Sequence, residues 1–573
     1  MNISATSFAR PRLPRPKSPF NTFVAAVCAA LTLLIIYPLV GTIWKLFSGA
    51  EGSVLDSLVD VYGNPRLPTV LSNTALVVGA SIVVAVIVGT TLAWLNERTN
   101  ARVGWSSDVL PVVSLLVPST AGAIGWLLLG SPYVGYVNGA LRNLGNLIGV
   151  GMPDLNIFSR PGMIFVYSLY LIPQVYLVVA AAMRNIDPAM EEAARVSGRR
   201  TMRVFLTVTL PAVRPAVISG ALLALIYGLS MFSIPLIIGT QAEVPILTVE
   251  IVRMVTVDYP ADLLGAALLS LLLLLAVLAM NSAARSVSKR GNHATIGGKA
   301  SGQSVYRFGW GPKLLARIFM FGYVTIGCLL PVAALCLVAL QPYWSGEFNI
   351  NFQLDAFRGI FESGTQTALA LRNSLGLAVI TATICMGVAI LVAYQIARAK
   401  RLGEPLNAVT KLPGTVSHVI LAIAFLSVFA GPPFSLGGTV AILLLVYVVL
   451  YITQATVSAQ SAALQVGKDL TEASLVAGRG PGETLRRISL PLMTPGIAAG
   501  WVFVVVLVIG DITASAILAG TNSPVVGFTM LSLFQNSTYT SLAAFATIVT
   551  LLSTVIVVTT LVWTNRSRDR LKR

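Results

Sequence analysis

Residues 188–215 read PAMEEAARVSGRRTMRVFLTVTLPAVRP, and the key positions of this stretch recur later in the chain. Glu192-Ala193-Ala194, Gly198 and Leu210-Pro211 correspond to Glu472-Ala473-Ser474, Gly478 and Leu490-Pro491, each 280 residues further on. Both copies are arginine-containing polar loops between long apolar runs. A loop repeated with fixed spacing indicates two similar halves that present the same surface twice.

The composition indicates a polytopic membrane protein. Of the 573 residues, 55% are hydrophobic and only 11% are charged, whereas soluble proteins carry about 25% charged residues. The net charge of +17 resides in short loops, where membrane orientation explains it better than nucleic-acid binding does. The four cysteines and two histidines show no disulfide or metal spacing.

Apolar runs predict twelve transmembrane helices in two sets of six, an all-α fold. The first set lies near 22–45, 71–95, 108–130, 162–183, 213–238 and 262–281, and the second near 315–340, 374–397, 412–430, 437–458, 497–519 and 541–563. We therefore predict a tail at 1–21, a first half at 22–281 with its loop at 184–212, a linker at 282–312, a second half at 313–563 with its loop at 459–496, and a tail at 564–573.

The distribution of basic residues predicts the orientation. With the N-terminus inside, 32 of the 39 Lys and Arg residues fall in inside segments, as the positive-inside rule requires. Arg10, Arg12, Arg15 and Lys17 precede the first apolar run, which we interpret as a retained helix and not as a cleaved signal. Both termini and both duplicated loops are then cytoplasmic.

The repeat extends beyond the loops, so the halves are expected to be parallel copies. Asn73-Thr74 and Leu92-Ala93-Trp94 match Asn373-Ser374 and Val392-Ala393-Tyr394 at an offset of 300. Val117-Pro118-Ser119-Thr120 resembles Leu412-Pro413-Gly414-Thr415, and Gly220 and Gly239-Thr240 match Gly500 and Gly520-Thr521.

Each duplicated loop is predicted to be a short helix, a glycine turn and a second short helix. Asp187 is a suitable N-cap, Pro188 fits the first helical position, and Glu191 and Glu192 complement the helix dipole. Gly198 suits a left-handed helix end, with a second helix over about 199–209. In the second copy, Asp469 and Glu472 have N-cap and N3 spacing. The alternative is a lipid-bound amphipathic helix.

The pattern Glu-Ala-Ala, three residues, Gly, nine residues, hydrophobic-x-Leu-Pro resembles the signature of binding-protein-dependent ABC importer permeases. The first copy has Val208 where that family prefers Ile, and the second has Ser474 in place of the last Ala. The resemblance implies the type I importer permease fold, with loops that fit a cleft on an ATP-binding subunit. It assigns that contact to Glu191, Glu192, Ala193, Ala194, Gly198, Leu210, Pro211, Glu472, Ala473, Ser474, Gly478, Leu490 and Pro491.

A chain with two such loops resembles the fused permeases of ferric-iron importers, and also those for thiamine and some phosphonates. The implied partners are two ATP-binding subunits, which bind ATP and Mg, and a periplasmic or lipid-anchored substrate-binding protein. The chain itself is not expected to be an enzyme: around Gly298-Lys299, a phosphate loop would need glycine at His293 and Ser or Thr at Ala300. Ferric iron is the favoured substrate, with thiamine, phosphonate and polyamine left open.

Asp511 is the clearest pathway candidate, because a carboxylate within an apolar span normally faces the bundle interior. Thr513, Ser515, Ser230 and Ser233 lie in the same or the equivalent span. Asp511 either contacts a cationic substrate or makes a structural hydrogen bond between helices. Pro235 is expected to kink the fifth span, as a gate or for packing, and His418 is a packing residue or a metal ligand.

An ion-driven secondary transporter with six plus six spans is the alternative from another class. That class requires no duplicated Glu-Ala-Ala loop and usually carries more charged residues within its spans.

Overall fold

The computed structural model describes residues 19–48, 59–103, 110–259, 261–291, 306–346, 351–362, 364–398, 400–464, 466 and 468–572. Within this part of the chain the elements are helices, and one isolated parallel β-bridge joins Thr99 to Tyr306. The all-α fold class is therefore confirmed. Residues 1–18 of the predicted tail and residues 292–305 of the predicted linker, which include Gly298-Lys299, lie outside the described residues.

Ten helices of the described residues are long and apolar enough to cross a membrane. They carry exposed apolar side chains such as Leu33, Ile87, Leu275 and Val555, which suit contact with lipid. The first half contains α1 (Pro19–Ser48), α3 (Leu67–Arg98), α7 (Arg160–Arg184), α10 (Leu210–Ser230) and α12 (Leu263–Gly291). The second half contains α13 (Trp310–Val324) continued by η4 (Thr325–Leu329) and α14 (Leu330–Ala339), then α16 (Gln366–Arg398), α19 (Val440–Leu464), α22 (Leu490–Ile509) and α25 (Tyr539–Lys572).

The predicted third and ninth spans are short helices, α5 (Ser119–Gly130) and α18 (His418–Phe429). Twelve residues of helix extend about 18 Å, less than the ~30 Å hydrocarbon core. Pro118 and Ser417 adopt extended conformations directly before these helices and end the preceding turn. The segment before α5 is the 3₁₀ helix η1 (Leu110–Leu116). The segments before α18 are the helix α17 (Lys400–Lys411) and the 3₁₀ turn η5 (Pro413–Thr415).

The starts of α5 and α18 correct one detail of the predicted repeat. Ser119 and His418 are the equivalent first residues of the two helices. The pairing of Val117-Pro118-Ser119-Thr120 with Leu412-Pro413-Gly414-Thr415 is therefore wrong by a few residues, because Thr415 still belongs to the turn η5 before its helix. A short proline-containing motif has too little information to fix such a register.

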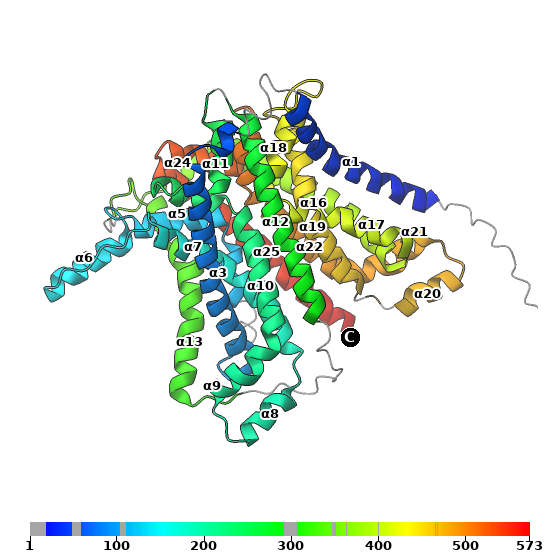
Figure 1. Ribbon diagram of the computed structural model, residues 1–573, viewed down its shortest axis with the longest axis horizontal. Helices are drawn as coiled ribbons and strands as arrows, with labels where there is room; N and C mark the ends of the chain where they lie inside the picture. The colour runs from blue at the N-terminus through cyan, green and yellow to red at the C-terminus, as the bar shows by residue number, and fades with distance from the viewer. Residues whose placement is uncertain are drawn as a thin grey trace, which may run out of the picture.

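The two halves exchange their first spans. The short helix α5 of the first half packs against α14 and α25 of the second, and α18 of the second half packs against α1 and α12 of the first. Glycines permit the closest approaches: a Cβ built on Gly125 would lie 2.5 Å from Pro331 Cβ, and one built on Gly41 would lie 2.8 Å from Val428 Cγ2. The halves therefore form one interlocked bundle (Figure 1).

The duplicated Asn-Thr and Asn-Ser pairs have the same function in both halves. Thr74 Oγ1 accepts the Leu247 N–H at 3.0 Å, at the start of α11 (Leu247–Thr256). Ser374 Oγ accepts the Val526 N–H at 2.8 Å, at the start of α24 (Val526–Gln535). Each hydroxyl satisfies a helix-terminal N–H that would otherwise lack a partner. The predicted parallel repeat is thus visible in equivalent hydrogen bonds.

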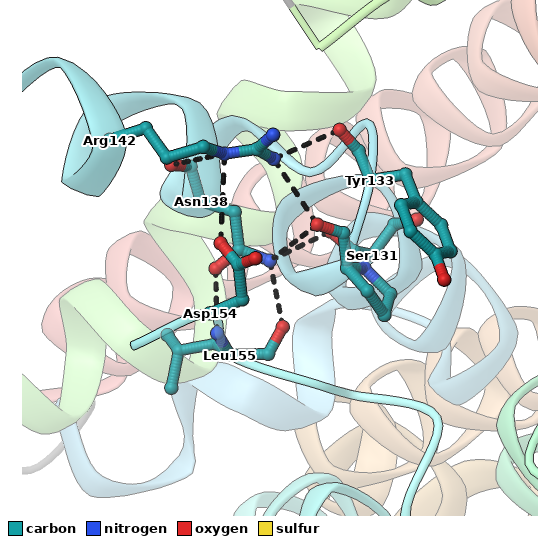
Figure 2. Close-up of polar contacts among 7 residues, drawn as sticks. Ser131, Tyr133, Asn138, Arg142, Asp154 and Leu155 are labelled. Atoms are coloured by element: carbon teal, nitrogen blue, oxygen red, sulfur yellow. Dashed lines mark hydrogen bonds and ion pairs between the residues drawn. The ribbon is translucent and has the colours of Figure 1, made fainter. Parts of the chain in front are cut away.

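An additional helix explains why the repeat offset falls from 300 to 280. α6 (Tyr136–Ile148) lies between α5 and α7 and projects from the bundle at the end opposite the duplicated loops (Figure 1). Its buried Asn138 accepts the Leu155 N–H at 2.7 Å and donates to the carbonyls of Ser131 and Leu155 at 2.8 and 2.7 Å (Figure 2). Arg142 adds bonds to the Pro132 and Tyr133 carbonyls at 3.2 and 2.9 Å. These polar contacts set the direction of α6.

We expect Asn138→Ala to destabilise this segment by about 1–3 kcal/mol, because buried backbone groups lose their partners. Thermal unfolding of the purified protein in detergent measures the effect. Asn143→Ala, at an exposed position of the same helix, is the matched control and is expected to leave the midpoint unchanged. Equal midpoints for the two variants would contradict the assignment.

Candidate functional site: duplicated loops and helix breaks

The two duplicated loops begin with equivalent short helices, α8 (Pro188–Val196) and α20 (Lys468–Val476). α8 is capped as predicted, since Asp187 Oδ1 accepts the Ala189 N–H at 2.9 Å and Pro188 takes the first helical position. Gly198 and Gly478 follow with φ of +77° and +81°, a left-handed conformation that glycine adopts without strain. The predicted glycine turns are confirmed.

The predicted capping box in the second loop is wrong. α20 starts at Lys468, so Asp469 already lies within the helix and does not occupy the N-cap position. The helix begins two residues before Leu470, where an N-cap at Asp469 would place its first residue, and the Asp-Glu spacing alone does not reveal this.

The predicted second short helix of each loop also differs. α9 (Thr201–Val204) continues through the π-helical turn η2 (Phe205–Thr209) into α10, and α21 (Pro481–Thr484) continues through η6 (Leu485–Ser489) into α22. Leu210 N–H bonds Phe205 O, and Leu490 N–H bonds Leu485 O. Pro211 and Pro491 lack an N–H and exclude the carbonyl four residues back, so the helix widens to i−5 bonds here.

The acidic residues of the first loop have different environments. Glu191 is fully buried, where its Oε1 accepts the Thr209 hydroxyl at 2.7 Å and its Oε2 lies 3.6 Å from Arg98 Nη1. The Glu192 side chain is 58% exposed and lies 3.6 Å from Arg195. Glu191 therefore holds the loop to the bundle, and Glu192 faces outward.

Arg98 is buried at the end of α3 and joins several segments. Its guanidinium donates to the carbonyls of Met183 at 2.5 Å and Ile186 at 3.1 Å, at the end of α7, in addition to its pairing with Glu191. The neighbouring Glu97 receives a bidentate contact from Arg184 at 2.8 and 2.9 Å. The first loop is thus fastened to α3 and α7 by charge-assisted bonds.

The second loop has no acidic residue at the position equivalent to the buried Glu191. Thr471 occupies the position equivalent to Glu191, while Glu472 is exposed like Glu192. Ser474 is buried and its hydroxyl lies 3.0 Å from that of Thr484, so it joins the two arms of the loop. Ala193 and Ala473 are exposed and Ala194 is half-buried.

Exposed apolar residues on both loop helices were missed by the sequence analysis. Val196 and Val476 are each 89% exposed, and Met190 and Leu470 are also exposed. Both pairs are related by the offset of 280 that relates the loops, so the repeat itself could have revealed them. Large apolar side chains exposed at equivalent places on two polar loops are typical of a protein-binding surface.

Asp511 lies at a break between helices, so the prediction of a mid-helix carboxylate is wrong. α22 ends at Ile509 and α23 (Thr513–Leu518) follows. Asp511 Oδ2 accepts the Ala514 N–H at 3.0 Å, and Oδ1 accepts the Tyr451 hydroxyl at 3.1 Å. His418 Nδ1 lies 3.8 Å from the same Oδ1. The carboxylate therefore caps α23 and connects it to α18 and α19.

The fifth span breaks at the equivalent place. α10 ends at Ser230, and Pro235 begins the π-helical turn η3 (Pro235–Gly239). Ser233 Oγ accepts the Ser119 hydroxyl at 3.3 Å, whereas Ser230 Oγ donates within its own helix to Ile226 O at 2.9 Å. The structure brings Ser233 to the start of α5 as it brings Asp511 to the start of α18, but Ser230 makes only a local bond.

The remaining pathway candidates lie beside Asp511. Ser515 Oγ donates to the Asp511 carbonyl at 2.9 Å, and Thr513 is buried. The two halves meet at this level, since a Cβ built on Gly510 would lie 3.5 Å from Pro118 Cβ. Within the described ranges, no cluster of three His, Cys, Asp or Glu side chains forms a metal site at His418 or elsewhere.

The chain matches the family described as binding-protein-dependent transport system inner membrane component over residues 81–290 and 385–573. These two segments are more than half of the chain, and each contains one duplicated loop. The protein belongs to this family of ABC importer permeases and carries two copies of its domain in one chain.

Individual relatives agree with this assignment. The chain is 22% identical to the ferric transport system permease protein FbpB of Actinobacillus pleuropneumoniae, over 92% of this chain and 76% of the relative. It is 23% identical to the Fe(3+)-transport system permease protein FbpB 2 of Haemophilus influenzae, over 91% and 96%. A putative 2-aminoethylphosphonate transport system permease protein PhnU of Salmonella paratyphi A is 26% identical over 37% of this chain and 72% of the relative.

The buried Arg98–Glu191 pair gives a stability prediction. Arg98→Met should lower the free energy of unfolding by about 3–5 kcal/mol, because it leaves a buried carboxylate without its cation. Denaturation monitored by tryptophan fluorescence in detergent measures this loss. Arg203→Met, at an exposed position of the same loop, should have little effect. A wild-type unfolding curve for Arg98→Met would refute the role assigned to the pair.

Proposed function

We propose that this chain is the membrane-spanning subunit of an ATP-driven importer and that α8 and α20 are the docking helices for two copies of an ABC ATP-binding subunit. The partner subunits bind and hydrolyse ATP with Mg, and this chain contributes no ATP site. The observation that carries the proposal is the equivalent exposure of Val196 and Val476 beside Glu192 and Glu472. Each helix presents an apolar contact and an acidic group to a partner.

The loops and both termini are proposed to face the cytoplasm. The support is the location of 32 of the 39 Lys and Arg residues in the segments on that side. The opposite face, with α6, α11 and α24, then receives substrate from a periplasmic or lipid-anchored binding protein. ATP binding to the partner would draw the loops together and rock the interlocked halves, and hydrolysis would reset them.

Ferric iron is the proposed substrate. Relatives named for ferric transport align with more than 90% of this chain, whereas the aminoethylphosphonate permease aligns with 37%. Phosphonate is the second candidate because of that relative, and thiamine and polyamine stay as further alternatives.

Asp511 is proposed to line the translocation path and to contact a cationic substrate there. It lies at the level where the halves meet, next to Tyr451 and His418. Its carboxylate provides a negative charge for a cationic substrate. Ser233, Thr513 and Ser515 line the same breaks, whereas Ser230 is a weaker candidate because its hydroxyl bonds within its own helix.

The docking proposal is tested by co-purification with the ATP-binding subunit in detergent. We expect the double variant Val196→Asp, Val476→Asp to lose the subunit, because each carboxylate would be buried in the interface without a partner. Glu192→Lys with Glu472→Lys should also abolish binding or uncouple it from transport.

Val257→Asp is the matched control, since Val257 is an exposed valine at the end opposite the loops. ATP-dependent uptake in proteoliposomes that persists after the proton gradient is collapsed would support the importer. Absence of any ATP-binding partner, with uptake that disappears with the gradient, would favour an ion-coupled transporter instead.

The role of Asp511 is separated from its capping role by substitution with asparagine. Asn is as good an N-cap as Asp, so Asp511→Asn should preserve stability while reducing ferric-iron uptake about tenfold or more, for a loss of about 1.4 kcal/mol in transition-state stabilisation. Asp511→Ala should lower both stability and uptake. The measurement is ATP-dependent uptake of radioactive iron in proteoliposomes. Full uptake by Asp511→Asn would show that the charge is dispensable.

A further inference from the structure

Residues 306–309, here called the strap, precede α13 but lie on the first loop. The Tyr306 N–H donates to Arg98 O at 2.8 Å, and the Asn100 N–H donates to Tyr306 O at 3.0 Å. These bonds form the parallel bridge between Thr99 and Tyr306. The strap therefore pairs with the chain directly after α3, beside the arginine that holds the first loop.

Side-chain hydrogen bonds add to this backbone pairing between the strap and the residues after α3. Asn100 exchanges two bonds with the backbone of Phe308, donating to its carbonyl at 3.2 Å and accepting its N–H at 3.0 Å. Arg317 of α13 donates to the Ala101 carbonyl at 3.2 Å. The strap and the first turns of α13 are thus fixed to residues 98–101 over several consecutive contacts.

Tyr306 connects the strap to the loop helix itself. Its side chain is buried, with 2% of the residue exposed, and the Arg195 guanidinium of α8 lies over its ring at 5.0 Å from the centroid. Burial, together with the nearby Glu191 carboxylate, raises the pKa of the Tyr306 phenol. A neutral phenol ring under a guanidinium is a cation–π contact that joins α8 to the strap.

A cluster of aromatic rings also connects the strap to α3 and to the first loop. Trp94 of α3 lies 4.6 Å from Phe205 of the loop, 5.8 Å from Phe308 and 6.3 Å from Tyr306, measured between ring centroids. Phe205 belongs to the second arm of the first loop. The first arm of the loop therefore contacts the strap directly through Arg195, whereas the second arm is joined to it indirectly, because Phe205 packs on Trp94 and Trp94 packs on the strap.

Beyond the strap, α13 continues along the first half. The Tyr323 hydroxyl lies 2.8 Å from the Ser114 hydroxyl and 3.2 Å from the Leu169 carbonyl, to which it donates. α14 then packs on α5. Figure 1 shows the start of α13 beside α9 and α8, far from α20. The first span of the second half is therefore attached at its start to the first loop.

The second loop differs at the key position. The residue equivalent to Arg195 is Leu475, and Tyr394 replaces Trp94. The residues ahead of α1 that would correspond to the strap lie outside the described part of the chain. The cation over a buried tyrosine is thus a feature of the first loop in its contact with the strap.

We infer that the strap transmits displacement of α8 to α13, so that an ATP-binding subunit docked on the first loop moves the first span of the second half directly. Tyr306 is the positioning residue of this connection. Two segments move together when the contacts between them persist in both states, and here backbone pairing, a cation–π contact and an aromatic cluster act in parallel. The inference rests on the proposed docking of an ATP-binding subunit at α8.

The test measures distances between spin labels in the full chain assembled with its ATP-binding subunits. Cysteine-free protein is labelled at exposed Ser197, which follows α8, and exposed Trp310, the first residue of α13. A separate sample is labelled at Ser197 and Ala477, one position on each loop. We expect ATP without Mg²⁺ to change the 197–477 distance and to leave the 197–310 distance unchanged. In Tyr306→Ala the 197–310 distance should change and its distribution broaden, while Tyr306→Phe should behave as wild type.

ATP hydrolysis provides the functional measurement. The stimulation of hydrolysis by the binding protein supplied with ferric iron should fall about 2- to 30-fold in Tyr306→Ala, the range by which residues between coupled sites alter coupling. Tyr306→Phe should restore it. Phe321→Ala, which removes an exposed aromatic side chain from α13 itself, is the matched control. Arg195→Met, which removes only the cation over the ring, provides the same comparison if Tyr306→Ala does not assemble.

The outcomes distinguish the two proposals. Wild-type distances and stimulation in both Tyr306→Ala and Arg195→Met would overturn the role of the strap and leave the docking proposal intact. Failure of the wild-type chain to bind any ATP-binding subunit would instead overturn the docking proposal.

Discussion

The buried guanidinium of Arg98 is the interaction on which the arrangement of the first loop depends. It satisfies two carbonyls at the end of α7 and the Glu191 carboxylate of α8. Since an unpaired buried charge costs several kcal/mol, the ends of α3 and α7 and the loop helix cannot separate independently. The loop is held as part of the bundle, so a force applied to α8 acts on α3 and α7 together.

The two halves repeat the same backbone conformations, but they differ in which equivalent positions carry charged side chains. Both halves have a loop helix, a left-handed glycine and a π-helical turn before Leu-Pro. Yet Thr471 replaces Glu191, Leu475 replaces Arg195, and Met231 stands where the second half has Asp511. A fused chain permits this divergence, because each half always meets the same partner half. The first half holds the buried ion pair of its loop, and the second half holds the carboxylate at the break.

Interrupted helices concentrate polar groups where the halves meet. α5, α10, α18 and α22 all begin or end near this level, and Ser119, Ser233, His418 and Asp511 lie at their ends. Exposed backbone groups at such ends require polar partners within a membrane. The residues that satisfy the helix ends are therefore also the polar groups at the level where the halves meet, which is why we propose a transport role for Asp511 beside its structural one.

The sequence by itself determined the all-α membrane fold, the two parallel halves and the loop geometry around Gly198 and Gly478, because these follow from local hydropathy, fixed spacing and the conformational freedom of glycine. Only the tertiary structure decided that Glu191 is buried while Glu192 is exposed, that Asp511 caps a broken helix, and that the residues before α13 pair with the end of α3. The burial of Glu191 and the pairing of the strap depend on contacts between residues tens to hundreds of positions apart, and the cap at Asp511, although local, is held in place by Tyr451, 60 positions away. No local sequence pattern predicts which of the adjacent residues Glu191 and Glu192 pairs with Arg98. None predicts that Tyr306 packs against the first half.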